Sequence, residues 1–258
     1  MLELSDRQLE RYARHVILDE VGEEGQAKLI AARVLVVGAG GLGAPLLLYL
    51  GAAGVGTLGV VDDDTVDLSN LQRQVIHDES TLGLAKVASA QARLAKLNPD
   101  VRVVAHQERL NAENVERLIA DYDIIADGSD NFRTRYLLND VCFKLKKTLV
   151  SAALLRFDGQ LSTYKAHLGE GYPCYRCIFP DQPPADLIPR CEEAGIFGAV
   201  AGVMGCLQAT EVLKEILDLG DSLSGRLLIY DALAPAFRTV RIAKDPDCPC
   251  CAQPPTGG

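Results

Sequence analysis

The sequence predicts an α/β fold in which helices cover both faces of a mostly parallel sheet, and in which later strands extend that sheet. Strand-like and helix-like segments alternate from residue 33 to residue 155, as they do where helices connect parallel strands. After residue 155 the alternation stops, and the last two strand-like runs are spaced as a hairpin. No repeat or linker divides the 258 residues, so we expect one continuous domain.

The first elements form one strand–helix–strand unit. Residues 1–32 are a charged, helix-like arm. The β-branched run at 33–37 is a strand that enters a glycine turn, the apolar run at 42–55 is a helix, and residues 56–61 are a second strand that ends in acids. The stretch from Val34 onward lacks charge, but its glycines, its proline and its changing pattern favour this unit over a membrane span.

Two more strands and helices continue the alternation. A polar loop at 64–81 leads to a helix at Leu84–Leu97, and residues 101–107 are a third strand. Asn111 is placed to cap the next helix, at 111–121. The fourth strand then runs into the acidic loop DGSDN, and a further helix to about residue 146 and a strand at 148–154 follow.

The second half reads differently. We expect an extended strand at 159–167 and an irregular loop, rich in Pro, Cys and Gly, at 169–195. The nearly apolar run at 195–217 predicts a helix that has to be buried. The runs at 225–233 and 236–244 predict the hairpin.

The composition excludes several classes of protein. The net charge of −9 and a pI of about 5.0 argue against a broad nucleic-acid surface. The first 30 residues are charged throughout and lack the apolar run of a signal peptide. We therefore expect a cytoplasmic protein with no membrane and no nucleic-acid partner.

The motif GAGGLG indicates a nucleotide site. Gly38, Gly40 and Gly43 fit the spacing GxGxxG between a strand and a helix, and Asp62 ends the next strand. Glycines allow the backbone to approach a phosphate, and the acid is placed to bond a ribose hydroxyl. The alternative is a tight turn without a ligand, and the motif by itself does not separate NAD from ATP.

Nearby charges favour a triphosphate. Asn70 and Arg73 follow Ser69 in SNLQRQ, and Lys86 stands near the start of a helix. Fixed positive charges in one cleft suit a triphosphate whose bridge is broken in the reaction. The alternative for each cation alone is a solvated surface position.

Asp127 and Asp130 follow the fourth strand, at the edge of the sheet where open α/β folds bind ligands. A carboxylate beside phosphates is suited to Mg²⁺. The alternative, which does not exclude the first, is that Asp130 caps the following helix.

Two CxxC pairs predict a structural zinc site. Cys174 with Cys177 and Cys248 with Cys251 match a tetrahedral thiolate site, although 70 residues separate the pairs. A redox dithiol is the alternative. Cys250 is left over. The remaining loop cysteine, Cys191, is a candidate reactive thiol next to Arg190, although an incidental cysteine is the more frequent case.

These pieces, in this order, resemble the MoeB/ThiF/HesA adenylyltransferases, which are relatives of ubiquitin-activating enzymes. The resemblance covers RYARHVIL, VLVVGAGGLGAP, SNLQRQ, GLAKV, DGSDN, PCYRC, CEEAG and the final CxxC, from about residue 7 to residue 252. It implies a Rossmann-like fold divided into an N-terminal arm (1–32), a nucleotide-binding half (33–155), a carrier-binding and zinc half (156–252) and a disordered tail (253–258).

The resemblance also implies the reaction. A nucleotidyltransferase of this family uses ATP and Mg²⁺ to adenylate the C-terminal Gly-Gly carboxylate of a small ubiquitin-like sulfur carrier, in molybdopterin or thiamine-thiazole synthesis, and releases pyrophosphate. The implied enzyme is a homodimer with structural Zn²⁺. Because the chain stops shortly after the last cysteines, a separate sulfurtransferase or cysteine desulfurase is expected to supply sulfur.

Roles carry over position by position. Gly41 would contact the nucleotide beside Gly38, Gly40 and Gly43, and Asp62 would bind the ribose. Ser69, Asn70, Arg73 and Lys86 would surround the phosphates, with Asn131 alongside. Asp130 would hold Mg²⁺, and Arg14 would reach the ATP of the neighbouring subunit. Cys174, Cys177, Cys248 and Cys251 would bind Zn²⁺, and Cys191 matches a loop cysteine that some members use covalently.

Other classes stay open at this point. One is an NAD-dependent oxidoreductase on the same fold, which Arg73, Lys86 and the lack of an obvious hydride-site motif disfavour. Another is a non-catalytic zinc scaffold for a ubiquitin-like protein, which the presence of Asp130 disfavours. The acidic charge and the cysteine pairs disfavour a family variant that acts on a tRNA base.

Overall fold

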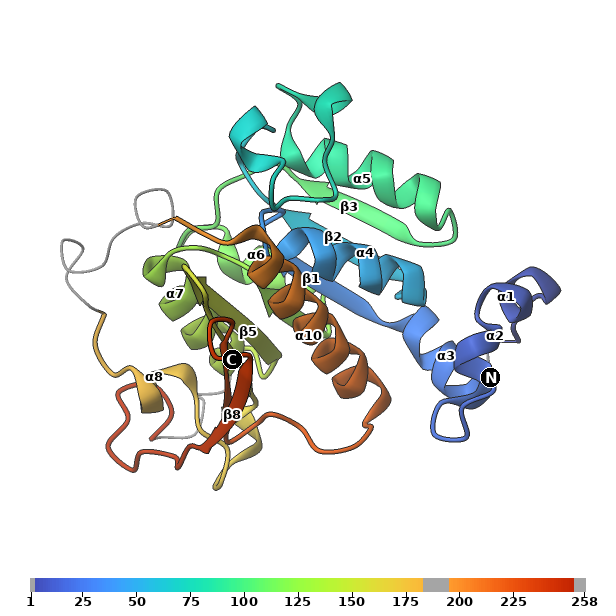
Figure 1. Cartoon of the computed structure of the whole chain (residues 1–258). Coiled ribbons are helices and arrows are strands. Elements are labelled where there is room, and N and C mark those ends of the chain that lie inside the picture. The colour runs from blue at the N-terminus through green and yellow to red at the C-terminus, as the bar shows by residue number, and fades with distance from the viewer. Residues whose placement is uncertain (1–2, 183–194, 253–258) are drawn as a thin grey trace.

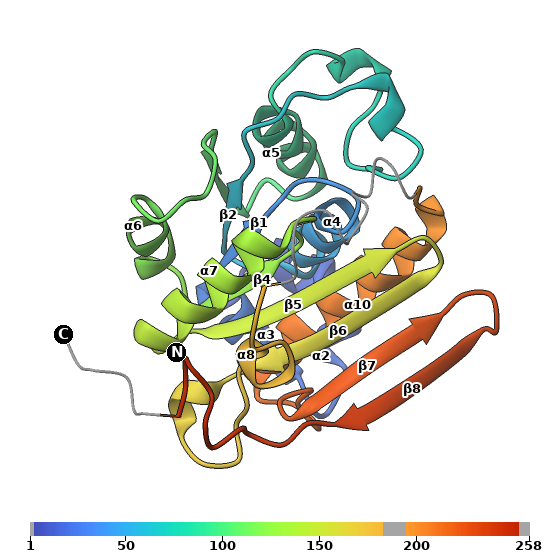
Figure 2. The ribbon, with the colours of Figure 1, turned by 90° about the vertical axis from the view of Figure 1, so that its left-hand side faces the viewer.

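The computed structural model describes residues 3–182 and 195–252 of the chain. The strands of this part are β1 (Arg33–Val37), β2 (Thr57–Val61), β3 (Arg102–His106), β4 (Ile124–Asp127), β5 (Thr148–Leu155), β6 (Asp158–Tyr164), β7 (Arg226–Asp231) and β8 (Ala236–Arg241). All eight described strands join one sheet in the order β3-β2-β1-β4-β5-β6-β7-β8. The pairings up to β5 are parallel, and those from β5 to β8 are antiparallel (Figure 2). The predicted mixed, continuous sheet is confirmed.

Helices cover both faces of the parallel part. Those described are α1 (Asp6–Arg11), α2 (Ala13–Val16), α3 (Gly22–Ala31), α4 (Gly43–Ala53), α5 (Lys86–Leu97), α6 (Val115–Ala120), α7 (Phe132–Lys144), α8 (Tyr175–Ile178) and α10 (Gly198–Leu217), with 3-10 turns η1 (Leu68–Asn70), η2 (Glu79–Thr81) and η3 (Ala166–Leu168). One core holds α4, α5 and α10, and the other holds α6 and α7 (Figure 1). None of these helices is both long and apolar enough to cross a membrane.

Strand β1 shows why two cores form. Val34 and Val36 point into the core under α4, whereas Leu35 and Val37 point into the core under α7, because successive side chains of a strand alternate between faces. All four are buried. Strand order reverses at β1, which has β2 on one side and β4 on the other. In open α/β sheets the crevice at such a reversal, at the carboxyl ends of the strands, is where ligands bind.

The N-terminal arm packs at the amino ends of the parallel strands, opposite the carboxyl ends where the glycine turn lies. The hydroxyl of Tyr12, between α1 and α2, accepts a hydrogen bond of 2.8 Å from Nδ2 of Asn98, which follows α5. The same ring lies against Gly54 at the end of α4. Since both contacts are at the ends of helices that lead back to the starts of strands, the arm lies away from the glycine turn (Figure 1).

The predicted cap at Asn111 is confirmed, since its Oδ1 accepts from the amides of Glu113 and Asn114, but the expected start of the helix was wrong: these residues form a turn and α6 begins at Val115. A second expectation was also wrong. The loop expected to be irregular from residue 169 contains α8. The predicted tail at 253–258 lies outside the described residues.

Candidate functional site

The glycine turn brings β1, β4 and the start of α4 into close contact. Gly38 has a φ of +94°, which side-chain-bearing residues rarely adopt. A Cβ on Gly43 would lie 1.8 Å from the carbonyl oxygen of Gly38, and one on Gly38 would lie 3.0 Å from that of Gly128. The turn therefore leaves its backbone bare at the N-terminus of an 11-residue helix, where the dipole favours an anion.

Asp62, directly after β2, braces this turn. Its carboxylate accepts hydrogen bonds from the amides of Ala39, at 2.8 Å, and Asp64, at 2.9 Å. Burial raises the pKa of Asp62, and the nearby charge of Lys86 and these two bonds oppose that rise. The residue expected at the ribose thus also holds the backbone of the glycine turn.

Lys86 begins α5 beside the same carboxylates. Its side chain is 8% exposed, and Nζ forms an ion pair of 2.8 Å with Asp64, which is 66% exposed. Lys86 is therefore a nearly buried ammonium whose anionic partner is open to solvent.

The loop after β2 places Arg73 against the turn. A Cβ on Gly41 would lie 3.5 Å from Cγ and Cδ of Arg73, so the two residues are in contact distance. Nη1 of Arg73 donates to the carbonyl of Ser69 at 3.1 Å. Asn70 closes η1 by accepting from the amide of Asp67 through Oδ1, at 3.2 Å. The fold thus places Arg73 against Gly41, with Asn70 three residues earlier at the end of η1.

The two aspartates of the DGSDN loop, Asp127 and Asp130, lie in different environments. Asp127 is fully buried, and its carboxylate accepts from the amide and hydroxyl of Ser129 and from the hydroxyl of Ser151, at 2.6–2.9 Å. Asp130 is exposed, and among the described residues its carboxylate accepts one long hydrogen bond, from Nδ2 of Asn131 at 3.5 Å. Asp127 is therefore a structural anchor, and Asp130 has oxygens free for a cation.

The helix-cap alternative for Asp130 was wrong. Asn131, not Asp130, is the N-cap of α7, and its Oδ1 accepts from the amide of Thr134 at 2.9 Å. Asn131 has the extended backbone of a cap, with φ −136° and ψ 145°.

Sequence reasoning missed three buried polar residues around the turn. His77 contacts Ala39 of the turn and Ser89 of α5. Gln74 is 3% exposed and lies beside Gly40. Gln208 of α10 donates to the carbonyls of Asp127 and Val150. Polar residues in a polar loop or on a helix carry no periodic signal, so only their burial reveals them.

Two predicted site residues are not in this group. Arg14 lies on α2, is exposed, and belongs to the arm at the opposite edge of the sheet. Cys191 lies outside the described residues.

The four CxxC cysteines form a second centre. Sγ of Cys174 lies 3.6 Å from that of Cys248 and 4.0 Å from that of Cys177, which lies 3.5 Å from that of Cys251. All four sulfurs lie within 4.8 Å of one another. A tetrahedral zinc site with Zn–S bonds of about 2.3 Å has sulfurs about 3.8 Å apart, so the group fits Zn²⁺.

The surroundings of this centre hold it in place. Arg176 of α8 pairs with both carboxylate oxygens of Asp140, each at 2.7 Å, and the amide of Tyr175 donates to Oδ1 of Asn139. Both contacts hold the segment between Cys174 and Cys177 against α7. Burial, followed by the hydrogen bond with Cys177, raises the pKa of Cys251 to about 12. Cys250 is not one of the four sulfurs and instead accepts from Nδ2 of Asn139 at 3.5 Å.

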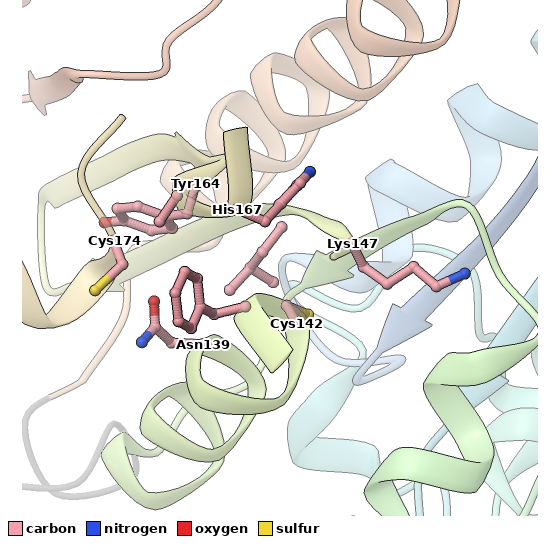
Figure 3. A pocket seen from close by; sticks show the side chains of 9 residues that line it. Asn139, Cys142, Lys147, Tyr164, His167 and Cys174 are labelled. Carbon is pink, nitrogen blue, oxygen red and sulfur yellow. The ribbon is translucent and has the colours of Figure 1, made fainter. Parts of the chain in front are cut away.

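A small cavity lies next to this centre, between α7, β5 and β6 (Figure 3). Its lining includes Cys142, Tyr164 and His167, and it has room for about one water molecule. This cavity is too small for a nucleotide, so the candidate nucleotide site is the group of residues at the glycine turn.

Fold and site together define a Rossmann-like α/β protein with a phosphate-type glycine turn and a separate four-cysteine centre. The model of the ThiF family matches residues 12–250. The chain therefore belongs to the ThiF family.

Relatives that match nearly the whole of this chain agree with this assignment. The chain is 50% identical to the SAMP-activating enzyme E1 of Haloferax volcanii, over 98% of this chain and 92% of that protein. It is 49% identical to the sulfur carrier protein adenylyltransferase of Thermus thermophilus, over 96% and 93%. It is 52% identical to the adenylyltransferase and sulfurtransferase MOCS3 of Bos taurus, over 98% of this chain but 55% of that protein.

Solved structures support the fold alone. The crystal structure of E. coli MccB with ATP has a TM-score of 0.81 and 21% identity, over 93% of this chain and 74% of that chain. At this identity the likeness carries the architecture and not the substrate.

Proposed function

We propose that this chain uses ATP to adenylate the C-terminal carboxylate of a small ubiquitin-like sulfur carrier that ends in Gly-Gly. The observation that carries the proposal is the meeting of Gly41, Arg73, Lys86 and Asp62 at the carboxyl edge of the sheet, in a chain of the ThiF family. The names of the relatives in Haloferax and Thermus support the activity and the class of substrate.

The reaction asks for positioning more than for acid or base chemistry. A carboxylate oxygen of the carrier forms a bond to the α-phosphorus of ATP, the bond from that phosphorus to the bridging oxygen breaks, and pyrophosphate leaves with the electron pair. The carboxylate is already ionised near pH 7, so no general base is needed. Its approach to a polyanion requires fixed positive charge, which Arg73 and Lys86 would supply.

The other residues of the crevice have matching parts. Asp62 would accept from a ribose hydroxyl, while the bare backbone at Gly41 and the amides of Asn70 and Asn131 would meet the nucleotide. Asp130 has an exposed carboxylate with free oxygens, which fits a Mg²⁺ ligand. When bound, Mg²⁺ would neutralise charge on the phosphates.

The four cysteines would hold Zn²⁺ as a structural ion. The sulfur spacing supports this, and the arrangement ties the chain end to the loop before α8. We also propose a homodimer, in which Arg14 of one protomer reaches the ATP of its partner. Its position on the arm, away from the glycine turn of its own chain, supports that arrangement.

The test is exchange of labelled pyrophosphate into ATP. The zinc-loaded protein is incubated with ATP, Mg²⁺ and a Gly-Gly-ended carrier, and the control is the same carrier without its last glycine. We expect exchange with the intact carrier alone, and its loss in Asp130→Ala. No exchange with intact molybdopterin- or thiazole-type carriers would contradict the proposal, and retained exchange in Asp130→Ala would contradict the role of that carboxylate.

A further inference from the structure

His77 lies where three parts of the candidate nucleotide site meet. It is 6% exposed. Its Nε2 lies 3.0 Å from the carbonyl oxygen of Ala39, in the middle of the glycine turn, and its Nδ1 lies 2.8 Å from Oγ of Ser89. Ser89 stands on α5, three residues after Lys86, and His77 itself ends the loop that carries Arg73.

The two contacts define how the ring is protonated. A carbonyl oxygen only accepts, so Nε2 has to carry the proton that bonds to Ala39. Nδ1 is then an acceptor, and the hydroxyl of Ser89 donates to it. Burial lowers the pKa of His77, which keeps this neutral form near pH 7.

The loop transmits the position of His77 to Arg73. The amide of His77 donates to the carbonyl of Gln74 at 3.0 Å, and the amides of Gln74 and Arg73 both donate to the carbonyl of Asn70, at 3.0 and 3.1 Å. These hydrogen bonds tie His77 to the backbone on both sides of Arg73. On the other side, Ala39 is held by Asp62, so the imidazole joins two structured parts.

We infer that His77 is a positioning residue, which holds the glycine turn, the Arg73 loop and the Lys86 helix in the arrangement that receives the phosphates of ATP. It does not touch the nucleotide. Its N–H on the Ala39 carbonyl sets the distance between the turn and the loop, and its bond to Ser89 sets the distance to α5. This inference rests on the proposed ATP site, whereas its geometry belongs to the free protein.

Two variants of similar size separate this role from simple filling of space. The amide nitrogen of a glutamine at this position reaches about as far as Nε2 does, whereas that of an asparagine reaches only as far as Nδ1. His77→Gln therefore keeps a donor for the Ala39 carbonyl, and His77→Asn leaves that buried carbonyl without a partner. The matched control is His106→Gln, because His106 bonds to the hydroxyl of Tyr122 and not to the turn.

The first measurement needs no ligand. We expect His77→Asn to speed amide hydrogen exchange of residues 39–41 and 70–74 by about tenfold, and His77→Gln and His106→Gln to leave it within about twofold. Nitrogen-15 NMR of the wild type is expected to show His77 protonated on Nε2. The same exchange in the Asn and Gln variants, or a proton on Nδ1, would overturn the inference.

The second measurement is calorimetric binding of ATP with Mg²⁺. We expect about tenfold weaker binding in His77→Asn and a smaller loss, within about threefold, in His77→Gln, which keeps a donor for Ala39 but not the bond to Ser89. Equal affinities of the two variants would overturn the inference. If the wild type bound no ATP, the proposed function would fail, while the exchange and NMR results would still decide the role of His77. Should His77→Asn not fold, Ser89→Ala serves instead: it removes only the bond that joins the imidazole to α5, so faster exchange is expected at the start of α5, and unchanged exchange there would overturn the inference.

Discussion

Replacing Gly43 with alanine tests the geometry of the glycine turn most directly. The added Cβ would lie 1.8 Å from the carbonyl oxygen of Gly38 and 2.8 Å from its carbonyl carbon. To reach 3.0 Å from that oxygen, the start of α4 would have to move away from the turn by about 1.2 Å. Neither atom is the end of a flexible side chain, so backbone has to give way.

The loss of stability expected for Gly43→Ala is at the upper end of the range for an extra methyl group in a packed interior. An extra methyl group in a packed interior costs about 1–3 kcal/mol, and we expect about 3 kcal/mol here because backbone meets backbone. For a chain of this size that lowers Tm by about 6–12 °C. The displaced helix start would also widen the phosphate crevice, so weaker ATP binding should accompany the lower stability.

Gly40 provides a control from the same motif. A Cβ there would have Nε2 of Gln74 as its nearest neighbour, at 3.7 Å, which is ordinary contact. Gly40→Ala is therefore expected to keep Tm within about 2 °C of the wild type. Chemical and thermal denaturation of the two variants side by side is the assay. Equal stability of Gly43→Ala and Gly40→Ala would refute the reasoning.

Three further predictions follow from buried groups. Zinc measured by atomic absorption should be retained in Cys250→Ser and lost in Cys251→Ser, and a full metal content in the latter would show that the wrong sulfurs were chosen. Asp127→Ala should lower the free energy of unfolding by about 3 kcal/mol because it leaves buried donors unpaired, whereas Asp130→Ala should change it by under about 0.5 kcal/mol; denaturant titration decides, and similar losses would contradict the assignment. Burial lowers the pKa of His77, so as the pH falls below about 6.5 the unfolded chain takes up a proton that the folded chain does not, and the free energy of unfolding decreases. Denaturant titrations at several pH values should show a smaller decrease in His77→Gln, and the same decrease in both proteins would count against this reasoning.

Local patterns were sufficient wherever a residue's partners are close in sequence or its element is periodic. The alternation of apolar runs predicted the order of elements and the mixed sheet, and the spacing of GxGxxG predicted a bare turn before α4. Cys248 and Cys251, rather than Cys250, are the members of the last cluster that join the group of four, as the CxxC spacing predicted.

The sequence pattern could not assign different roles to similar polar residues that lie close together in the chain. Asp130 and Asn131 are both good helix caps by type, and the backbone angles of the folded loop selected Asn131. Asp127 and Asp130 are three positions apart, yet one is buried under three donors and the other is exposed. Burial depends on which distant segments pack on the loop.

The sequence by itself determined the class of fold, the glycine turn, the charged candidates around it and the four cysteines, because these depend on periodicity and on short spacings. Tertiary structure alone decided that Asp62 also braces the turn, that Lys86 rests on Asp64, and that His77 links the turn to two other segments. Each of these contacts joins residues 12 to 38 positions apart. A hydrogen bond over such a separation forms only when the sheet and its helices have brought both partners out of water together, and no local pattern records that event.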